Sequence, residues 1–175
     1  MRHYHWTSEF RGIYESGLKA HRAGVTRPGK MFDPAQQAAL ATIGCTAQEL
    51  FDFVDDGERY GEPDYEFTLL VTAVRRDYFL TIQKGIPSTR VIDMNQLPSK
   101  QAEVAGIAWL PRLIEKARAK LKGEMPPDLM YGCGGDRPFL ESVNVHAADF
   151  LRAVWAAGDD NARVVKYVQE SMRAN

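Results

Sequence analysis

Residues 40–54, LATIGCTAQELFDFV, decide the fold of this chain because residues 140–154, LESVNVHAADFLRAV, repeat their pattern. Matching or similar residues recur at a spacing of 100, where Leu40, Ile43, Ala47, Glu49 and Val54 return as Leu140, Val143, Ala147, Asp149 and Val154. The run before each stretch recurs at a spacing of 99, where Tyr14, Leu18, Ala20 and Gly24 correspond to Leu113, Ala117, Ala119 and Gly123. Chance agreement between two helical periodicities is the alternative. We predict two related halves with a cleft between them.

Local signals predict that both halves are helical. Thr46 and Glu49 have the spacing of a capping box, in which the hydroxyl and the carboxylate each bind a backbone amide at the start of a helix. Apolar residues recur with a helical period over about residues 7–23. Pro34 can open a second helix, which Gly44 ends. We therefore predict a mainly α fold, with residues 1–175 forming a single domain of two related four-helix halves at about 6–80 and about 102–173.

The remaining boundaries follow from turn-forming and extended patterns. The acidic stretch DDGERYGEPD, residues 55–64, indicates a solvated loop before a fourth helix at about 65–76. A connector at about 81–101 has β-branched and aromatic residues around a Gly-Ile-Pro-Ser break, which predicts short extended strands or an ordered linker. The fifth helix starts near Ala102 or after Trp109. Later helices are expected at about 139–143, 147–157 and 161–172.

Composition indicates a folded and soluble protein. The chain has 175 residues, of which 45% are hydrophobic, and this is enough for one sizeable core. Its 22 basic and 23 acidic residues nearly cancel, so no field of one sign favours nucleic acid. No segment approaches the roughly 20 consecutive apolar residues that a membrane crossing needs. Cys45 and Cys133 form no spaced framework and should stay as thiols, so we expect a cytoplasmic protein.

The stretch from Pro98 to Leu140 resembles a known family. The residues that carry the resemblance are the helix start Leu110, Pro111, Arg112, the helical run Lys116, Ala117, Arg118, Ala119, and the segment with Tyr131, Cys133 and Asp136. They resemble the bacterial family named domain of unknown function 5069. The resemblance covers much of the second half and implies a bacterial, helical, cytosolic protein. It implies no catalytic residue.

The segment Tyr131-Gly132-Cys133-Gly134-Gly135-Asp136 is the sharpest candidate for a binding site. Three glycines in so short a run allow a ligand to approach the backbone closely, and backbone amides in such a turn can bind an anion. We predict a pocket for a small anionic molecule between this turn and the basic fifth helix. Its expected ligand-binding residues are Arg112, Lys116, Tyr131, Gly134, Gly135 and Asp136, with Asp136 capping a helix or orienting a basic side chain. A plain turn between helices is the alternative.

Two residues are candidates for catalysis. Cys133 could act as a thiolate nucleophile if Arg112, Lys116 or Arg137 stabilised its charge, which would make the protein a thiol-dependent enzyme. The alternative is that Cys133 is a small buried hydrophobe. His146 could serve as an acid or base facing the cleft, but it corresponds to Thr46 and can equally be a helix N-cap. Whether the protein is an enzyme stays open at this point.

Other kinds of site have little support in the sequence. His3 and His5 could chelate a metal, but no third ligand lies near them in the sequence, and we expect no metal site. The sequence identifies no cofactor, and the phosphate-loop pattern is absent. The basic fifth helix could contact nucleic acid, yet the near-neutral charge argues against it. Trp109 and Trp155 are expected to anchor the core. A non-catalytic interaction module, or a helical homodimer, is the alternative function.

Overall fold

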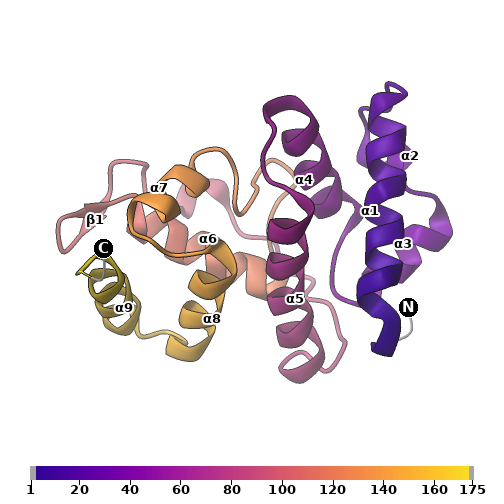
Figure 1. Cartoon of the computed structure of the whole chain (residues 1–175). Coiled ribbons are helices and arrows are strands. Elements are labelled where there is room, and N and C mark those ends of the chain that lie inside the picture. The colour runs from indigo at the N-terminus through magenta and orange to yellow at the C-terminus, as the bar shows by residue number, and fades with distance from the viewer. Residues whose placement is uncertain (1–2, 174–175) are drawn as a thin grey trace. The chain divides into compact units, whose positions relative to one another are not determined.

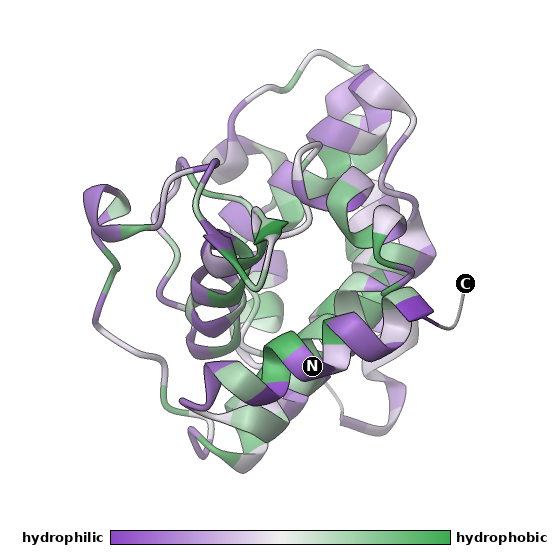
Figure 2. Ribbon diagram, turned by 90° about the vertical axis from the view of Figure 1, so that its left-hand side faces the viewer, coloured by the Kyte–Doolittle hydropathy of each residue, from purple (hydrophilic) through white to green (hydrophobic). Residues whose placement is uncertain are grey.

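The computed structural model describes residues 3–173 and confirms the mainly α fold (Figure 1). Over this range it contains nine α-helices, two short 3-10 helices and one two-stranded sheet. The chain divides into two compact units, residues 1–87 and 88–175, and the division falls within the stretch that the sequence indicated as a connector. Many of the helices carry a hydrophilic and a hydrophobic side (Figure 2).

The N-terminal unit is built from helices alone among its described residues. They are the 3-10 helix η1 (His3–His5) and the α-helices α1 (Trp6–Arg22), α2 (Pro28–Met31), α3 (Pro34–Ala41), α4 (Ala47–Tyr60) and α5 (Tyr65–Thr81). Helix α1 packs on α2, α4 and α5. The core of the N-terminal unit includes Phe10, Phe32, Leu40 and Leu50, each at most 1% exposed. The predicted capping box of α4 is confirmed, because Thr46 Oγ1 accepts from Glu49 N at 3.1 Å and Glu49 Oε2 accepts from Thr46 N at 2.8 Å.

The prediction of a solvated loop over residues 55–64 is wrong for its first part, since α4 continues to Tyr60 and ends at Gly61. Contacts with α1 hold this turn of helix in place. Asp55 Oδ1 lies 2.8 Å from His21 Nε2, and Glu58 accepts two hydrogen bonds from Arg22. Asp55 and Glu58 therefore join two helices, Asp55 through its contact with His21 and Glu58 through an ion pair with Arg22. Helix α5 is also longer than the range 65–76 that the sequence indicated.

The C-terminal unit combines four α-helices with a small hairpin among its described residues. Its elements are the 3-10 helix η2 (Met94–Gln96), the strands β1 (Glu103–Val104) and β2 (Ile107–Ala108), and the helices α6 (Leu110–Lys122), α7 (Asp136–Ser142), α8 (Ala147–Ala157) and α9 (Asn161–Arg173). The strands are antiparallel, with Glu103 opposite Ala108. Helix α6 packs on α8, α9 and β1.

Helix α6 begins after Trp109, the second of the two starts that the sequence indicated, because the hairpin occupies residues 103–108. Helix α7 begins at Asp136, three residues before the expected range. The core of the unit includes Leu110, Leu113, Phe150 and Leu151, each fully buried. In the part of the chain that the structure describes, no helix combines the length and the hydropathy needed to cross a membrane.

One turn recurs in both units with the same backbone hydrogen bond. Cys45 N donates to Leu40 O at 3.1 Å, and Val145 N donates to Leu140 O at 2.9 Å. The residue before each amide has a positive φ, 68° at Gly44 and 55° at Asn144. The chain thus turns in the same way between α3 and α4 as between α7 and α8. Duplication of the whole halves stays a prediction.

Candidate functional site

The Gly-rich turn and α6 meet at the carboxylate of Asp136, which is completely buried. Three groups donate to it. Lys116 Nζ lies 2.5 Å from Oδ2, Gly132 N donates to the same oxygen at 2.9 Å, and Trp109 Nε1 donates to Oδ1 at 3.0 Å. A buried carboxylate without such donors would cost several kcal/mol, on the order of the penalty for other buried charges. Asp136 therefore orients a basic side chain, one of the two roles that the sequence indicated.

Trp109, which donates to this carboxylate, has a strained backbone conformation. Its φ is 70°, a region that bulky residues rarely adopt. The indole ring lies over Gly135, where a Cβ atom would come within 2.8 Å of two ring carbons. Gly135 is therefore required for close packing of the ring. Trp109 was expected to anchor the core, and no local pattern in the sequence connects it with Asp136.

Lys116 carries its charge into the interior, with a side chain only 3% exposed. Besides its contact with Asp136, the ammonium lies 3.4 Å from Cys133 Sγ. Cys133 itself is partly exposed. The Lys116 ammonium of α6 thus lies between the Cys133 thiol and the Asp136 carboxylate, and Cys133 is the most exposed of the three residues. Because Asp136 already neutralises Lys116, this ammonium is a poor partner for an external anion.

Tyr131 is buried beneath the turn and ties it to the start of α8. Its hydroxyl donates to Ala147 O at 2.8 Å, and the residue is 1% exposed. Burial, followed by the charge of Asp136 and the neighbouring Tyr167, raises the pKa of Tyr131 well above its ordinary value. The hydroxyl is thus a structural donor that stays protonated at physiological pH.

This raised pKa predicts a loss of stability in alkali. In the unfolded chain tyrosine ionises near pH 10, whereas Tyr131 keeps its proton in the folded protein. The contribution of Tyr131 to the free energy of unfolding is therefore complete below about pH 10 and is lost as the pH rises further. We expect Tyr131→Phe to lose about 1 kcal/mol at neutral pH, through the missing hydrogen bond, and to decline less steeply above about pH 10. Urea unfolding at a series of pH values measures both effects. Parallel pH profiles for the two proteins would contradict this account.

Arg112 has a different place from the one the sequence indicated. Its guanidinium donates to Pro98 O at 2.8 Å. At the other end of α6, Ile92 N donates to Glu124 O at 2.9 Å. These two bonds fasten residues 92–98 alongside α6. Arg112 thus holds the connector in place, and the structure does not bring it into contact with the Gly-rich turn.

Residues 90–97 of the connector and α6 line an open pocket of about 160 Å³. Its basic lining residues are Arg90, Arg118 and Lys122, and its acidic ones are Asp93, Glu115 and Glu124. Ile92 and Leu97 contribute an apolar wall. We name this site the α6 pocket. Sequence reasoning found the basic helix but missed the pocket, because its other wall comes from residues 90–97.

Most acidic groups of the α6 pocket already have partners. Glu124 accepts from Ser88 Oγ at 2.8 Å and lies 4.0 Å from Arg90 Nε. Asp93 accepts from Asn95 N at 2.9 Å and so caps η2. Glu115 lies 2.6 Å from Arg118 Nη1, but its side chain is 41% exposed. The carboxylate of Glu115 is thus the more exposed member of the pair, so Glu115 is the acidic group that a ligand can most easily displace.

Two neutral acceptors hold the guanidinium of Arg118 in position. Its Nη2 donates to Asn161 Oδ1 at 2.6 Å and to Gly158 O at 3.0 Å. Both acceptors lie at the junction of α8 and α9. The guanidinium is therefore anchored whether or not Glu115 is bound, and an anchored guanidinium loses little freedom when it binds an anion.

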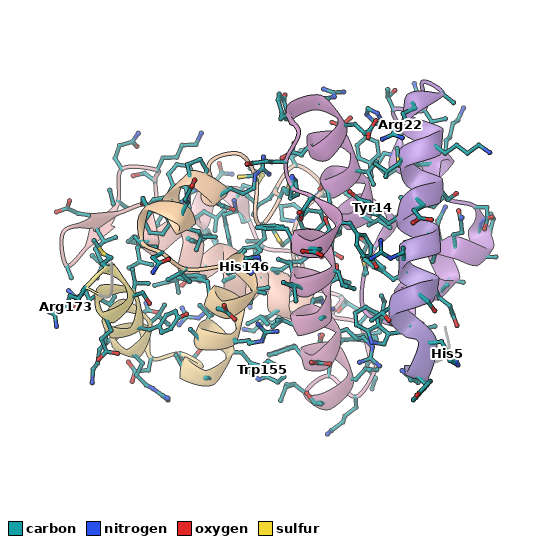
Figure 3. The ribbon with its side chains drawn as sticks, in the orientation of Figure 1. His5, Tyr14, Arg22, His146, Trp155 and Arg173 are labelled. Atoms are coloured by element: carbon teal, nitrogen blue, oxygen red, sulfur yellow. The ribbon has the colours of Figure 1, made fainter. Side chains whose placement is uncertain are left out.

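The other candidate residues lie apart from these contacts. His146 is the N-cap of α8, where its Nδ1 accepts from Ala148 N at 3.1 Å (Figure 3). His3 Nδ1 lies 3.1 Å from Arg76 Nη2. Among residues 3–173, no group of three histidine, cysteine, aspartate or glutamate side chains is arranged to hold a metal ion. Gly134 and Gly135 are exposed at the surface of the turn.

The comparisons with known proteins bear on the C-terminal part of the chain. The family model for a domain of unknown function, DUF5069, matches residues 94–175. This range contains α6 to α9 together with the Gly-rich turn. The match confirms, over the C-terminal part of the chain, the resemblance to this family that was seen in the sequence. No curated protein and no solved structure matches the chain.

Proposed function

We propose that the C-terminal unit binds a small molecule with a phosphate or carboxylate group in the α6 pocket. The observation that carries this proposal is the placement of Arg118. Gly158 and Asn161 anchor its guanidinium, and its ion pair in the pocket is with the partly exposed carboxylate of Glu115. An incoming anion takes the place of Glu115. The anion binds at Nη1 through a charge-assisted hydrogen bond, because Nη2 already donates to Gly158 O and Asn161 Oδ1.

Lys122 and the apolar wall define the rest of the ligand. Lys122 lies one turn beyond Arg118 on α6 and lines the same pocket, so it adds positive charge beside the anionic group. Ile92 and Leu97 offer contact to a short carbon skeleton. The pocket suits a small organic phosphate or acid better than a bare inorganic ion. This proposal keeps the anionic ligand that the sequence suggested and moves its site from Lys116 to Arg118.

Removal of the competing carboxylate provides the sharpest test. We expect Glu115→Gln to bind glycerol 3-phosphate about two- to fivefold more tightly, because Arg118 no longer gives up an ion pair worth a few tenths of a kcal/mol and a repulsive charge is gone. We expect Arg118→Ala to weaken binding about ten- to a hundredfold, the loss of a charge-assisted hydrogen bond. Isothermal titration calorimetry with glycerol 3-phosphate, succinate and inorganic phosphate measures both, with uncharged glycerol as the blank.

A second ion pair in the same unit supplies the matched control. Asp149 and Arg152 on α8 have the same i, i+3 spacing as Glu115 and Arg118, with 2.7 Å between Oδ1 and Nη1, and they do not line the pocket. We expect Asp149→Asn and Arg152→Ala to bind like the wild type. Equal changes from both pairs would show an effect of net charge alone. No saturable heat with any of the three anions would overturn the proposal.

A further inference from the structure

The Gly-rich turn and α6 bring together three reactive side chains that do not line the α6 pocket. Cys133 Sγ lies 3.4 Å from Lys116 Nζ, and that nitrogen lies 2.5 Å from Asp136 Oδ2. The thiol is partly exposed, while the amine and the carboxylate are at most 3% exposed. A small oxidant can therefore reach the sulfur from solvent, and the oxidised sulfur would face the amine.

We propose that Cys133 and Lys116 form an oxidation-dependent covalent link, a sulfenamide between Sγ and Nζ. A hydroperoxide supplies the oxidant. The sulfur attacks the peroxide, the O–O bond breaks and an S–O bond forms, so the sulfur is oxidised by two electrons to a sulfenic acid and hydrogen peroxide is reduced to water.

The second step is a condensation in which no electrons are gained or lost overall. Asp136 takes one proton from the Lys116 ammonium, and the freed lone pair attacks the sulfur. An N–S bond forms as the S–O bond breaks, and the departing hydroxide takes a second proton from the nitrogen and leaves as water. Sulfenic acids undergo the same reaction with backbone nitrogen. Asp136 is the base in this scheme because it is the carboxylate in contact with the amine.

The arrangement of the cysteines favours the amine as the resolving group. Cys133 is the only cysteine in residues 88–175, so its own unit offers no second thiol for a disulfide. The other cysteine, Cys45, is 3% exposed. Exposure and thiolate character decide which cysteine reacts first with peroxide, and exposure favours Cys133.

The N-terminal unit indicates that the fold itself does not require this charged group. In the predicted repeat, Lys116 corresponds to Gly17 and Asp136 to Gln36. A Cβ atom at Gly17 would lie 3.0 Å from the Phe32 ring, and Gln36 Nε2 donates to Ser16 Oγ at 3.1 Å. The corresponding helices are thus joined there by apolar packing and a neutral hydrogen bond. The buried ammonium beside a cysteine is a feature of the C-terminal unit.

The test uses the reduced full-length protein, treated with equimolar hydrogen peroxide and analysed by intact mass spectrometry and tryptic mapping. We expect a mass about 2 Da below that of the reduced protein, recovery of the original mass with dithiothreitol, and a peptide pair joined through Lys116 and Cys133. Cys45→Ser should behave in the same way. If Cys45→Ser abolishes the loss of mass, the product is a disulfide and the proposal is overturned.

A conservative variant separates the role of the Lys116 amine as a nucleophile from the role of its positive charge. Lys116→Arg keeps a cation next to Asp136 but removes the primary amine. We expect this variant to accumulate sulfenic acid, with a gain of about 16 Da, under the equimolar peroxide with which the wild type forms the link. If the wild type gains the same mass at the same rate and yields no joined peptides, Lys116 does not trap the sulfenic acid and the proposal fails. The mapping of the wild type decides the question even if the variant does not fold.

Discussion

Asp136→Ala is expected to lower the free energy of unfolding of the C-terminal unit by about 3–5 kcal/mol, the cost of removing one partner from a buried ion pair. The change leaves the Lys116 ammonium in the interior without its counter-ion. It also deprives Trp109 Nε1 and Gly132 N of their acceptor. The loss should therefore exceed that of an ordinary hydrogen bond, which is about 1 kcal/mol.

Native-state hydrogen exchange over residues 110–142 measures this effect within the unit, independently of the N-terminal helices. Asp128→Ala is the control, because Asp128 is an exposed carboxylate in the loop between α6 and α7. We expect its effect to stay within about 0.5 kcal/mol. The double variant Lys116→Met with Asp136→Leu should recover part of the loss, since no buried charge remains. A loss below about 1 kcal/mol in Asp136→Ala would show that the pair does not hold the turn.

Gly44→Ala is expected to destabilise the N-terminal unit by about 2–4 kcal/mol, through a left-handed backbone and an overpacked contact. The φ of Gly44 is 68°, and a Cβ atom there would lie 2.6 Å from Phe79 Cγ. Phe79 is 3% exposed and therefore has little room to move away. The backbone strain and the close contact with Phe79 arise from the same Cβ atom, so this one substitution introduces both.

Asn144→Gly is the matched substitution in the C-terminal unit. Asn144 occupies the corresponding turn with a φ of 55°, which asparagine tolerates better than most residues. We expect a change within about 0.5 kcal/mol for this variant. Urea unfolding measures the change in stability of each variant, and hydrogen exchange assigns that change to one of the two units. If Gly44→Ala is as mild as Asn144→Gly, the contact with Phe79 does not constrain the turn.

Local signals in the sequence predicted much of the helical framework. The capping box at Thr46, the helix after Trp109 and the N-cap at His146 all depend on residues within a few positions of one another. The end of α4 was missed because residues 55–60 look like a loop by composition. Their partners, His21 and Arg22, come from a distant part of the chain, so no local pattern reveals these contacts.

The candidate site was predicted in part for a similar reason. The Gly-rich turn and Lys116 were identified, and the structure brings Lys116, Cys133 and Asp136 together. Lys116 was predicted to bind an external anion, whereas the structure pairs it with Asp136, which lies 20 residues later in the chain. The α6 pocket depends on the fastening of residues 92–98 along α6, which the sequence alone does not indicate.

The central claim is that Arg118 and its neighbours bind a small anion, and NMR of the arginine side chains tests it most directly. We would titrate the ¹⁵N-labelled full-length protein with glycerol 3-phosphate and follow the Nε–H signals of Arg118, Arg112 and Arg152. The account predicts a saturable shift of the Arg118 signal, a smaller one at Arg112 through the connector, and none at Arg152. Equal or unsaturable shifts at all three arginines would contradict it.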